Sequence, residues 1–425
     1  IYKINYLTMK RSLHISFLSI LFFSCSQNLA INSRSELNVE ISDRDILEHI
    51  KYLSSDELEG RYPGSKGSDL AIDYIATDYK RSRLSPLGSD NYLQFFDFTN
   101  QKGEKIRVPN VVGMIPGTNL KKEYIVIGAH FDHLGYGGAH SGSLEMSSRA
   151  IHNGADDNAS GVAGMLELAS KLSVERKSLQ RSIIFVAFNA EEQGIFGSKY
   201  FVQNSPVNPS NIITMINLDM IGRLKNLSLN ISGTGTSTVF NKILDKASAK
   251  HYLNISKNPE GFGPSDHSSF YSNDIPVLFF FTGGHSDYHK PSDDWEKINS
   301  KGQMKIINMI YDIILEIDKN NERPQFVEAG PKTMASPGRV KLKVTFGFMP
   351  SYTSSGKGLG VDGVRSEGPA GKAGIKKGDI VLEINGKTVE DIYGYMGILE
   401  TLQPGKSSVV KVLRDNNEIT FTVNH

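Results

Sequence analysis

Two adjacent carboxylates follow shortly after a continuous apolar run of the chain. The run spans residues 183–186, and Glu191 and Glu192 come five and six residues after its end. Such a run is typical of a strand that is buried on both faces of a parallel sheet. Because ligands of open α/β sheets bind beyond the carboxyl ends of the strands, both glutamates are expected at the mouth of a site. Neighbouring carboxylates repel each other, so either cations keep both ionised or the pKa of one rises.

Three other apolar runs and one helix start carry the same kinds of side chain. They are His130 and Asp132 after residues 124–129, Asp219 after 212–218, His289 after 276–281, and Asp157 at the start of a helix expected to run through residue 172. A single carboxylate at such a position is usually a helix cap or a turn residue. Several carboxylates at one sheet edge would be too costly to bury without cations. Histidine and carboxylate side chains are zinc ligands, and this set would fill two metal sites about 3.5–4 Å apart that share a bridging carboxylate.

The segments around these residues resemble the motifs of the co-catalytic di-zinc exopeptidases, a family that includes secreted bacterial aminopeptidases and glutamate carboxypeptidases. The resemblance covers roughly residues 40–320 and rests on five segments in the family's order. These are AHFDH (129–133), GADDNASG (154–161), NAEEQG (189–194), NLDMIGR (217–223) and DYHKPSD (287–293). The fold expected with it is an α/β three-layer sandwich around a central, mostly parallel sheet.

The resemblance implies a metal-binding role for five of these side chains. His130 and Asp219 would bind one zinc ion. Glu192 and His289 would bind the other, and Asp157 would bridge the two, so the expected cofactor is two zinc ions per chain. The peptide bond that follows Asp157 would be cis, as in relatives.

The resemblance also implies which residue transfers the proton during the reaction. Zinc lowers the pKa of a bound water from 15.7 towards about 7, and Glu191 would be the general base that takes the proton of that water. Asp132 would orient the ring of His130 without binding the metal itself. Tyr288 matches a tyrosine that helps some relatives to hold the developing oxyanion.

Several further polar residues near these motifs leave two interpretations open. Asp156 could cap a helix or belong to the site, Asp293 could support a ligand or form a turn, and Arg223 could meet a substrate or pair with a site carboxylate. His267 is not expected to be a ligand, because His289 fills that place. The remaining histidines of this region are expected to be exposed on loops: His133, His140, His152 and His285.

The order of apolar runs and breakers divides the chain into segments. Alternating strand and helix patterns predict an α/β peptidase domain at 41–322, with helices beginning near Asp43 and Gly67 and a closing helix at 303–318. Residues 323–339 are rich in Pro, Gly and Ala and are expected to form a linker. Residues 340–425 show several short strands, one helix and an Asn385-Gly386 hairpin turn, which predicts a small, mostly β domain.

This last segment resembles a PDZ domain of the bacterial kind. The resemblance rests on Thr345-Phe346-Gly347-Phe348, on residues 366–375 and on residues 377–386. In such domains a glycine-containing loop offers N–H groups to the C-terminal carboxylate of a peptide, which adds to the sheet as a strand. Phe346, Gly347 and Phe348 would form that loop here. A packing domain that binds no peptide is the alternative.

The beginning of the chain indicates export. Met9 is the expected start, and the basic pair after it precedes an apolar stretch, residues 13–23, that is too short to cross a bilayer and matches a secretory signal. Cys25 is the one cysteine of the 425 residues and ends this stretch, which resembles the lipidated cysteine of bacterial lipoproteins; a plain cleaved signal is the alternative. We therefore expect a signal segment at 9–25, a tether at 26–40 and a location in the bacterial cell envelope, either periplasmic or lipid-anchored. The net charge of +1 with dispersed basic residues gives no sign of a nucleic-acid partner, and membrane contact is expected only through a lipid on Cys25.

Together these features predict an exported zinc metallopeptidase that removes N-terminal residues from peptides. Three alternatives remain open at this point. The chain could be a glutaminyl-cyclase-like acyltransferase with one zinc, a carboxypeptidase that uses Arg223 or Arg149 for the substrate carboxylate, or an inactive scaffold that acts through its PDZ-like domain.

Overall fold

The computed structural model describes residues 40–100, 103–138, 141–145, 149–333, 343–350, 358–365, 367–390 and 392–425. The expected signal segment 9–25, with Cys25, lies outside this part of the chain, as does almost all of the tether. Among the described residues, no helix has the length and the apolar character that spanning a membrane requires.

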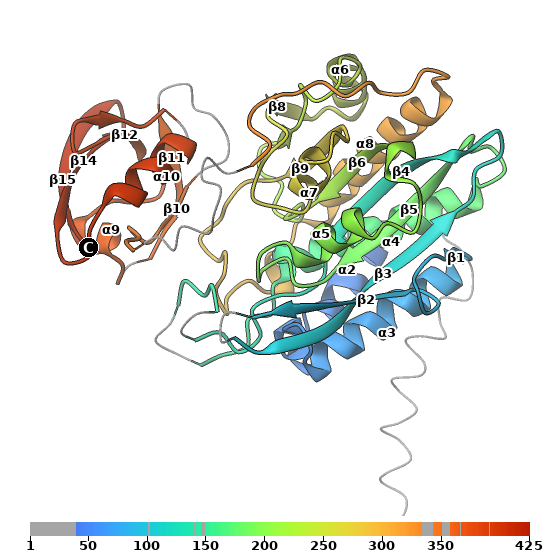
Figure 1. Cartoon of the computed structure of the whole chain (residues 1–425), viewed down its shortest axis with the longest axis horizontal. Helices are drawn as coiled ribbons and strands as arrows, with labels where there is room; N and C mark the ends of the chain where they lie inside the picture. Colours follow the sequence, from blue (N-terminus) through green and yellow to red (C-terminus); the bar gives the residue numbers. More distant parts are fainter. Residues whose placement is uncertain are drawn as a thin grey trace, which may run out of the picture.

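A nine-stranded mixed sheet forms the centre of the larger domain (Figure 1). Its strand order is β1-β3-β5-β4-β6-β9-β7-β8, with β2 paired to β3. The strands are β1 (Ser85–Pro86), β2 (Leu93–Thr99), β3 (Lys105–Ile115), β4 (Leu120–His130), β5 (Arg181–Phe188), β6 (Ile212–Leu218), β7 (Ser228–Ser232), β8 (Asn254–Asn258) and β9 (Val277–Phe281). The parallel pairing joins β5, β4, β6 and β9 at the centre, while β3 and β7 pair antiparallel with this block.

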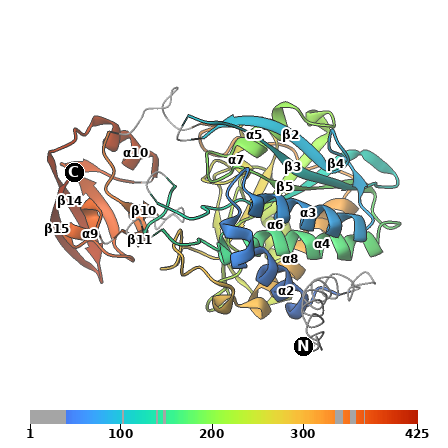
Figure 2. The ribbon, with the colours of Figure 1, turned by 90° about the horizontal axis from the view of Figure 1, so that it is seen from below.

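Helices cover both faces of this sheet, as expected for a three-layer sandwich (Figure 2). One face carries α2 (Asp43–Leu53), α3 (Lys66–Arg81), α4 (Gly161–Val174), α6 (Phe240–His251) and α8 (Ser300–Lys319). The other carries α5 (Phe196–Gln203) and α7 (His267–Tyr271). Every residue of β5 and β6 is buried between these layers, which explains why their sequences are continuous apolar runs rather than alternating ones.

The C-terminal domain has its own sheet and its own hydrophobic core. Its strands are β10 (Phe348–Pro350), β11 (Leu359–Val364), β12 (Ile380–Ile384), β13 (Lys387–Thr388), β14 (Ser407–Arg414) and β15 (Asn417–Asn424), and its helices are α9 (Pro369–Ala373) and α10 (Ile392–Thr401). Asn385 and Gly386 both have positive φ and join β12 to β13, which confirms the predicted hairpin turn. In the described residues 343–348 only Phe348 belongs to a strand, because β10 begins there, and Gly347 before it has a φ of +73°.

The described part of the expected linker, 323–333, lies against the larger domain. The Val327 N–H donates to the carbonyl of Thr236, and the Tyr271 hydroxyl donates to the carbonyl of Gly330. The proposed domain boundaries themselves stay a prediction.

Candidate metal centre

The ends of the central parallel strands bring the candidate residues into one cavity of about 300 Å³. β4 ends at His130, Glu191 and Glu192 follow β5, and Asp219 follows β6 directly. The loop after β9 supplies His289, and the irregular helical turn η2 (Ala155–Ser160) supplies Asp157 from the other side. Strand order thus explains why residues 159 positions apart in sequence (130 to 289) share one site.

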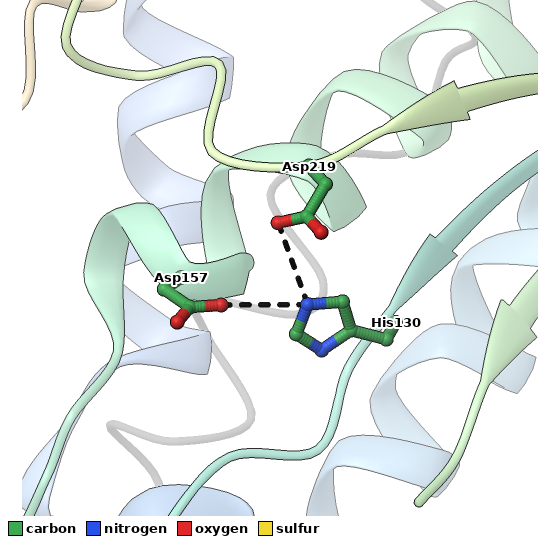
Figure 3. A group of neighbouring side chains, drawn as sticks. All are labelled: His130, Asp157 and Asp219. Atoms are coloured by element: carbon green, nitrogen blue, oxygen red, sulfur yellow. Dashed lines mark ion pairs between the residues drawn. The ribbon is translucent and has the colours of Figure 1, made fainter. Parts of the chain in front are cut away.

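The first group consists of His130, Asp157 and Asp219 (Figure 3). The Nε2 atom of His130 lies 3.4 Å from Oδ1 of Asp157 and 3.5 Å from Oδ1 of Asp219. The Nδ1 atom of His130 is 3.2 Å from the backbone carbonyl of Asp132; a proton on Nδ1 satisfies this contact and would leave Nε2 available to a metal. All three side chains are buried.

The second group repeats this arrangement around His289. Its Nε2 atom lies 3.2 Å from Oδ2 of Asp157 and 3.1 Å from Oε2 of Glu192. Its Nδ1 atom donates to the carbonyl of Gly142 at 2.9 Å, which again leaves the lone pair of Nε2 towards the carboxylates. Asp157 therefore directs one carboxylate oxygen to each group.

These separations fit metal coordination better than direct ion pairs. Two ligand atoms of one tetrahedral zinc, each at about 2.1 Å from the ion, lie about 3.4 Å apart. Charge-assisted hydrogen bonds between nitrogen and oxygen are shorter, about 2.7–2.9 Å. The four distances in the two groups, 3.1 to 3.5 Å, match the first case.

His133 is a member of the site that the sequence analysis missed. It was expected to be exposed, but it is fully buried, and its Nδ1 atom lies 2.8 Å from Oε1 of Glu192. His133, Asp157 and Glu192 also form a group that could hold a metal ion. Its position in the segment AHFDH, one residue after Asp132, was the signal that could have revealed it.

Two other histidines also differ from the expectation of exposure. His152 is buried, with Nε2 2.7 Å from the Ser143 hydroxyl. His285 is half-buried, and its Nε2 atom lies 3.1 Å from Oδ2 of Asp156. These two contacts hold the rings away from solvent, and neither contact could be predicted from the local sequence. His140 lies outside the described residues.

Asp132 connects the first metal group to the glutamate pair. Its Oδ1 atom accepts a hydrogen bond from the N–H of Glu191 at 3.0 Å, and its Oδ2 atom accepts one from the N–H of Glu192 at 3.3 Å. The carboxylate lies 3.9 Å from Nδ1 of His130, so the ring is contacted by the carbonyl of Asp132 rather than by its side chain. Burial raises the pKa of Asp132 to about 7.

The two glutamates have opposite electrostatic environments. Burial raises the pKa of Glu191 well above its ordinary value; the Asp266 carboxylate adds to the rise, and His130 opposes it. Burial also tends to raise the pKa of Glu192, but His289 and His133 together outweigh it and lower that pKa to about 2. One glutamate is thus prone to hold a proton, and the other stays ionised.

The η2 turn is held by polar side chains whose roles the sequence left open. The buried Asp293 carboxylate accepts hydrogen bonds from the N–H groups of Asp156 and Asp157 at 2.9 and 3.1 Å. Arg223 pairs with Asp293 at 2.8 Å, and Asp156 accepts a hydrogen bond from the N–H of Gly222 at 2.7 Å. Asp293 and Asp156 therefore support the turn, and the bond between Asp157 and the next residue is cis, as the resemblance implied.

A buried arginine from the N-terminal part of the domain holds the other side of this turn. Arg61 ends the 3-10 segment η1 (Asp56–Arg61), and its guanidinium donates to the carbonyls of Phe131, Asn153 and Gly154 at 2.7, 2.7 and 3.0 Å. The same guanidinium contacts the carbonyl of Leu53. Burial lowers the pKa of Arg61 to about 10, so the group stays charged at neutral pH.

Unusual backbone conformations occur next to three site residues. Ala190 before Glu191, Met220 after Asp219, and His289 itself have φ values of 57°, 55° and 53°. Non-glycine residues adopt this left-handed region rarely, and such residues concentrate at functional sites. The ring of Tyr288 stacks on that of His289 with 3.9 Å between the centroids and borders the cavity.

The structure also bears on the remaining candidates. His267 is buried and stacks on Phe279, with a 4.4 Å centroid separation, and it belongs to neither metal group. Of the arginines considered for a substrate carboxylate, Arg223 is engaged by Asp293, and Arg149 lies 5.3 Å from the centre of the Tyr136 ring.

Comparison with known sequences identifies two regions of the chain. Residues 110–314 match Peptidase family M28, and residues 340–424 match the PDZ domain family. Aminopeptidase YwaD of Bacillus subtilis is 26% identical over 301 residues, which cover 68% of this chain and 60% of the relative. A probable zinc metalloprotease of Phaeosphaeria nodorum is 32% identical over 141 residues, which cover 32% of this chain and 27% of that protein. This chain thus spans less than two thirds of either relative.

Solved structures share the fold of the larger domain. A Zn-dependent exopeptidase from Parabacteroides distasonis superposes with a TM-score of 0.55 at 20% identity, covering 65% of this chain and 98% of its own. A glutaminyl cyclase from Bacteroides thetaiotaomicron superposes equally well, with a TM-score of 0.55 at 20% identity, covering 67% of this chain and 99% of its own. At this identity the likeness establishes the α/β fold and does not separate the two activities.

Proposed function

Because the chain joins a domain of Peptidase family M28 to a PDZ domain, we propose that it is a zinc-dependent aminopeptidase that hydrolyses the N-terminal residue from peptides. The relationship to Aminopeptidase YwaD supports the choice of this reaction among those of the fold.

One observation carries the proposal: Asp157 places its two carboxylate oxygens against two separate histidines. His130 and Asp219 lie on one side of it and His289 and Glu192 on the other. Three carboxylates gathered in a largely buried cavity need cations to stay ionised. The donor set fits two zinc ions: His130 and Asp219 would hold one, His289 and Glu192 would hold the other, and Asp157 would serve both.

When bound, zinc supplies a Lewis acid that polarises the scissile carbonyl and lowers the pKa of a water towards about 7. Glu191 lines the same cavity, and its pKa is raised by burial, which suits a group that takes a proton from the attacking water and passes it to the leaving amine. Asp132 fixes the backbone position of Glu191 and Glu192 by accepting hydrogen bonds from their N–H groups. Tyr288 borders the cavity, where its hydroxyl can donate to the oxyanion.

The free α-amine of the substrate explains the preference for the N-terminus. Carboxylate oxygens that line the cavity can accept hydrogen bonds from a protonated amine. The cavity-lining Glu191, Glu192 and Asp219 are the candidates for this contact.

Hydrolysis assays on paired substrates test the proposal. The purified chain, loaded with zinc, should release the N-terminal residue from free-amine peptides and aminoacyl chromogenic amides, and should leave their N-acetylated counterparts intact. Cleavage of the N-acetylated peptides alone would overturn it. Cyclisation of glutaminyl peptides, with one zinc per chain and no hydrolysis, would establish the glutaminyl-cyclase alternative instead.

We further propose that the chain is exported to the bacterial cell envelope through the segment 9–25 and that Cys25 carries a lipid. The basic pair, the short apolar stretch and the position of Cys25 support this. Expression in bacteria with a radiolabelled fatty acid tests it: wild-type protein should be labelled and membrane-bound, and Cys25→Ser should be unlabelled. Labelling of both proteins would exclude Cys25 as the attachment site.

A further inference from the structure

The ring of His133 has a fixed position beside the metal centre. The residue comes three positions after His130, the last residue of β4, and its side chain is fully buried. Its N–H donates to the carbonyl of Arg61 at 3.4 Å. The ring makes an edge contact with the ring of His289, with 5.8 Å between the centroids. Gly154 also borders it, since a Cβ at that position would lie 2.5 Å from Cδ2 of His133. The ring therefore has little room to turn.

The contact between His133 and Glu192 is a direct hydrogen bond. Its length of 2.8 Å, from Nδ1 to Oε1, lies in the range of charge-assisted bonds, which is about 2.7–2.9 Å. The nitrogen–oxygen separations of His130 and His289 in the two metal groups are longer, 3.1 to 3.5 Å. Oδ2 of Asp157 is 4.0 Å from Nδ1 of His133. The distances that mark His130 and His289 as metal ligands thus set His133 apart from them.

This bond divides the two oxygens of Glu192 between different partners. Oε1 faces Nδ1 of His133, and Oε2 lies 3.1 Å from Nε2 of His289. The pKa of Glu192 is lowered to about 2, so its carboxylate is ionised at neutral pH and can only accept hydrogen bonds. A proton on Nδ1 of His133 satisfies the contact. The Nε2 atom of His133 is buried and has no hydrogen-bond partner among the residues that the structure describes. The polar contact of the ring is therefore the one with Glu192.

We propose that His133 is a positioning residue for the metal ligand Glu192. By holding Oε1, it leaves Oε2 as the oxygen that Glu192 directs to the ion of the His289 group. A carboxylate can bind a metal through one oxygen or through both. Binding through one oxygen keeps a coordination position free, as catalytic zinc sites require for water or substrate. The inference rests on the two-zinc site of the proposed function and concerns how the chain fixes one of its ligands.

Two substitutions at position 133 separate the hydrogen bond from the volume of the side chain. Asparagine and leucine have nearly the same size and shape, but only asparagine carries an N–H donor close to the place of Nδ1. In calorimetric titration of the full chain with zinc, His133→Leu should lose about 10- to 100-fold in affinity at one site and keep the other, as expected for a residue that supports a metal ligand. His133→Asn should recover most of that loss. His133→Phe, a second variant without the donor, should match His133→Leu.

Turnover of an aminoacyl chromogenic amide gives a second measurement. The kcat of zinc-loaded His133→Leu should fall by about 10- to 100-fold, and His133→Asn should recover most of this loss too. The matched control is His251→Leu, at the partly exposed end of α6. His251 belongs to none of the groups that could hold a metal, so this variant should keep the zinc affinities and the kcat of wild type.

Two outcomes would overturn the inference. One is an equal loss of zinc affinity in His133→Asn and His133→Leu, because the ring would then act by itself and not through the hydrogen bond. The other is wild-type affinity at both sites of His133→Leu. If His133→Leu does not fold, the comparison is made between His133→Asn and His133→Phe. Neither outcome bears on the proposed function as long as the wild-type chain cleaves the chromogenic amide. Absence of that cleavage by the zinc-loaded wild-type chain would refute the proposed function, and the zinc titrations would still decide the role of His133.

Discussion

The buried carboxylate of Asp132 accepts a hydrogen bond of 3.0 Å from the backbone N–H of Glu191. The contact joins the end of β4 to the turn after β5, so the two neighbouring strands set the position of the glutamate together. A side chain expected to orient a histidine thus acts mainly on the backbone of the proposed base.

This contact predicts the effect of Asp132→Asn. An amide group accepts through one atom only and turns its NH₂ group towards the other backbone N–H, so the Glu191–Glu192 turn should shift. We expect kcat to fall by about 10- to 100-fold, the range seen when residues that support the metal ligands are removed. The exposed Asp97→Asn is the matched control and should retain wild-type kcat. An Asp132→Asn enzyme with normal kcat and metal content would show that the contact is dispensable.

Glu191→Gln should separate metal binding from proton transfer. Glutamine has nearly the same shape but no basic oxygen, and removal of a general base costs about 100- to 10,000-fold in rate. We expect both zinc ions to remain, as measured by elemental analysis, while kcat falls by several orders of magnitude. Glu57→Gln, on the exposed surface of η1, should change neither quantity. Unchanged turnover in a metal-replete Glu191→Gln enzyme would remove the residue from its assigned role.

Metal stoichiometry tests the bridging position of Asp157. The wild-type chain should bind two zinc ions and lose activity when a chelator removes them. His130→Ala and His289→Ala should each lose affinity for one ion, whereas Asp157→Ala should weaken both, because its two oxygens face different histidines. Titration calorimetry with zinc would measure this, and a single-site isotherm for the wild-type chain would contradict the two-metal proposal.

Asp293→Asn should loosen the turn that presents Asp157. The substitution removes the ion pair with Arg223 and weakens the acceptor for two backbone N–H groups. We expect metal affinity to fall by about 10- to 100-fold without loss of the fold, since Asp293 belongs to neither metal group. Asp69→Asn on the exposed face of α3 serves as control. Equal zinc affinity in Asp293→Asn and wild type would assign Asp293 to stability alone.

His267 should make the protein sensitive to mild acid. Burial lowers its pKa from 6.5 to about 3, so the folded protein keeps the ring neutral while the unfolded chain takes up a proton below pH 6.5. Stability is therefore lost as pH falls from 6.5 towards 3, by about 2 kcal/mol at pH 5 from this group. His267→Phe, which can keep the stacking on Phe279, should show a smaller loss between pH 7 and pH 5 in urea unfolding. Parallel pH profiles for the two proteins would count against this origin of acid sensitivity.

The fold and the central residues of the site could be predicted because both follow from local pattern. β5 and β6 are buried throughout, so their sequences show continuous apolar runs, and the residues after them fall at the edge where such sheets bind ligands. The strands β7 and β8 at one edge of the sheet were not predicted, because they carry weaker, half-exposed patterns. The burial of His133 was not predicted, and the role of Asp293 was left open, for a different reason. Their burial depends on loops that close over them from distant parts of the chain, and no local spacing encodes that closure.

The position of the C-terminal domain beside the cavity could not be predicted from the sequence either. The glycine-containing loop at Phe346–Phe348 could be recognised, but nothing in the residues of either domain indicates that Gly347 and Arg365 line the same cavity as His289. That placement depends on contacts between the domains, such as the one between Lys377 and Gly284.

Arg61 limits how far the larger domain can be truncated from its N-terminal side. The match to Peptidase family M28 begins at residue 110, whereas Arg61 comes 49 residues earlier and supplies hydrogen bonds to the carbonyls of Phe131, Asn153 and Gly154. A truncated chain that starts at residue 110 would leave these three acceptors without that donor, at about 1–3 kcal/mol for each buried group. The smallest fragment that keeps these hydrogen bonds is therefore longer than the region matched by the family, and its amino-terminal limit lies before η1.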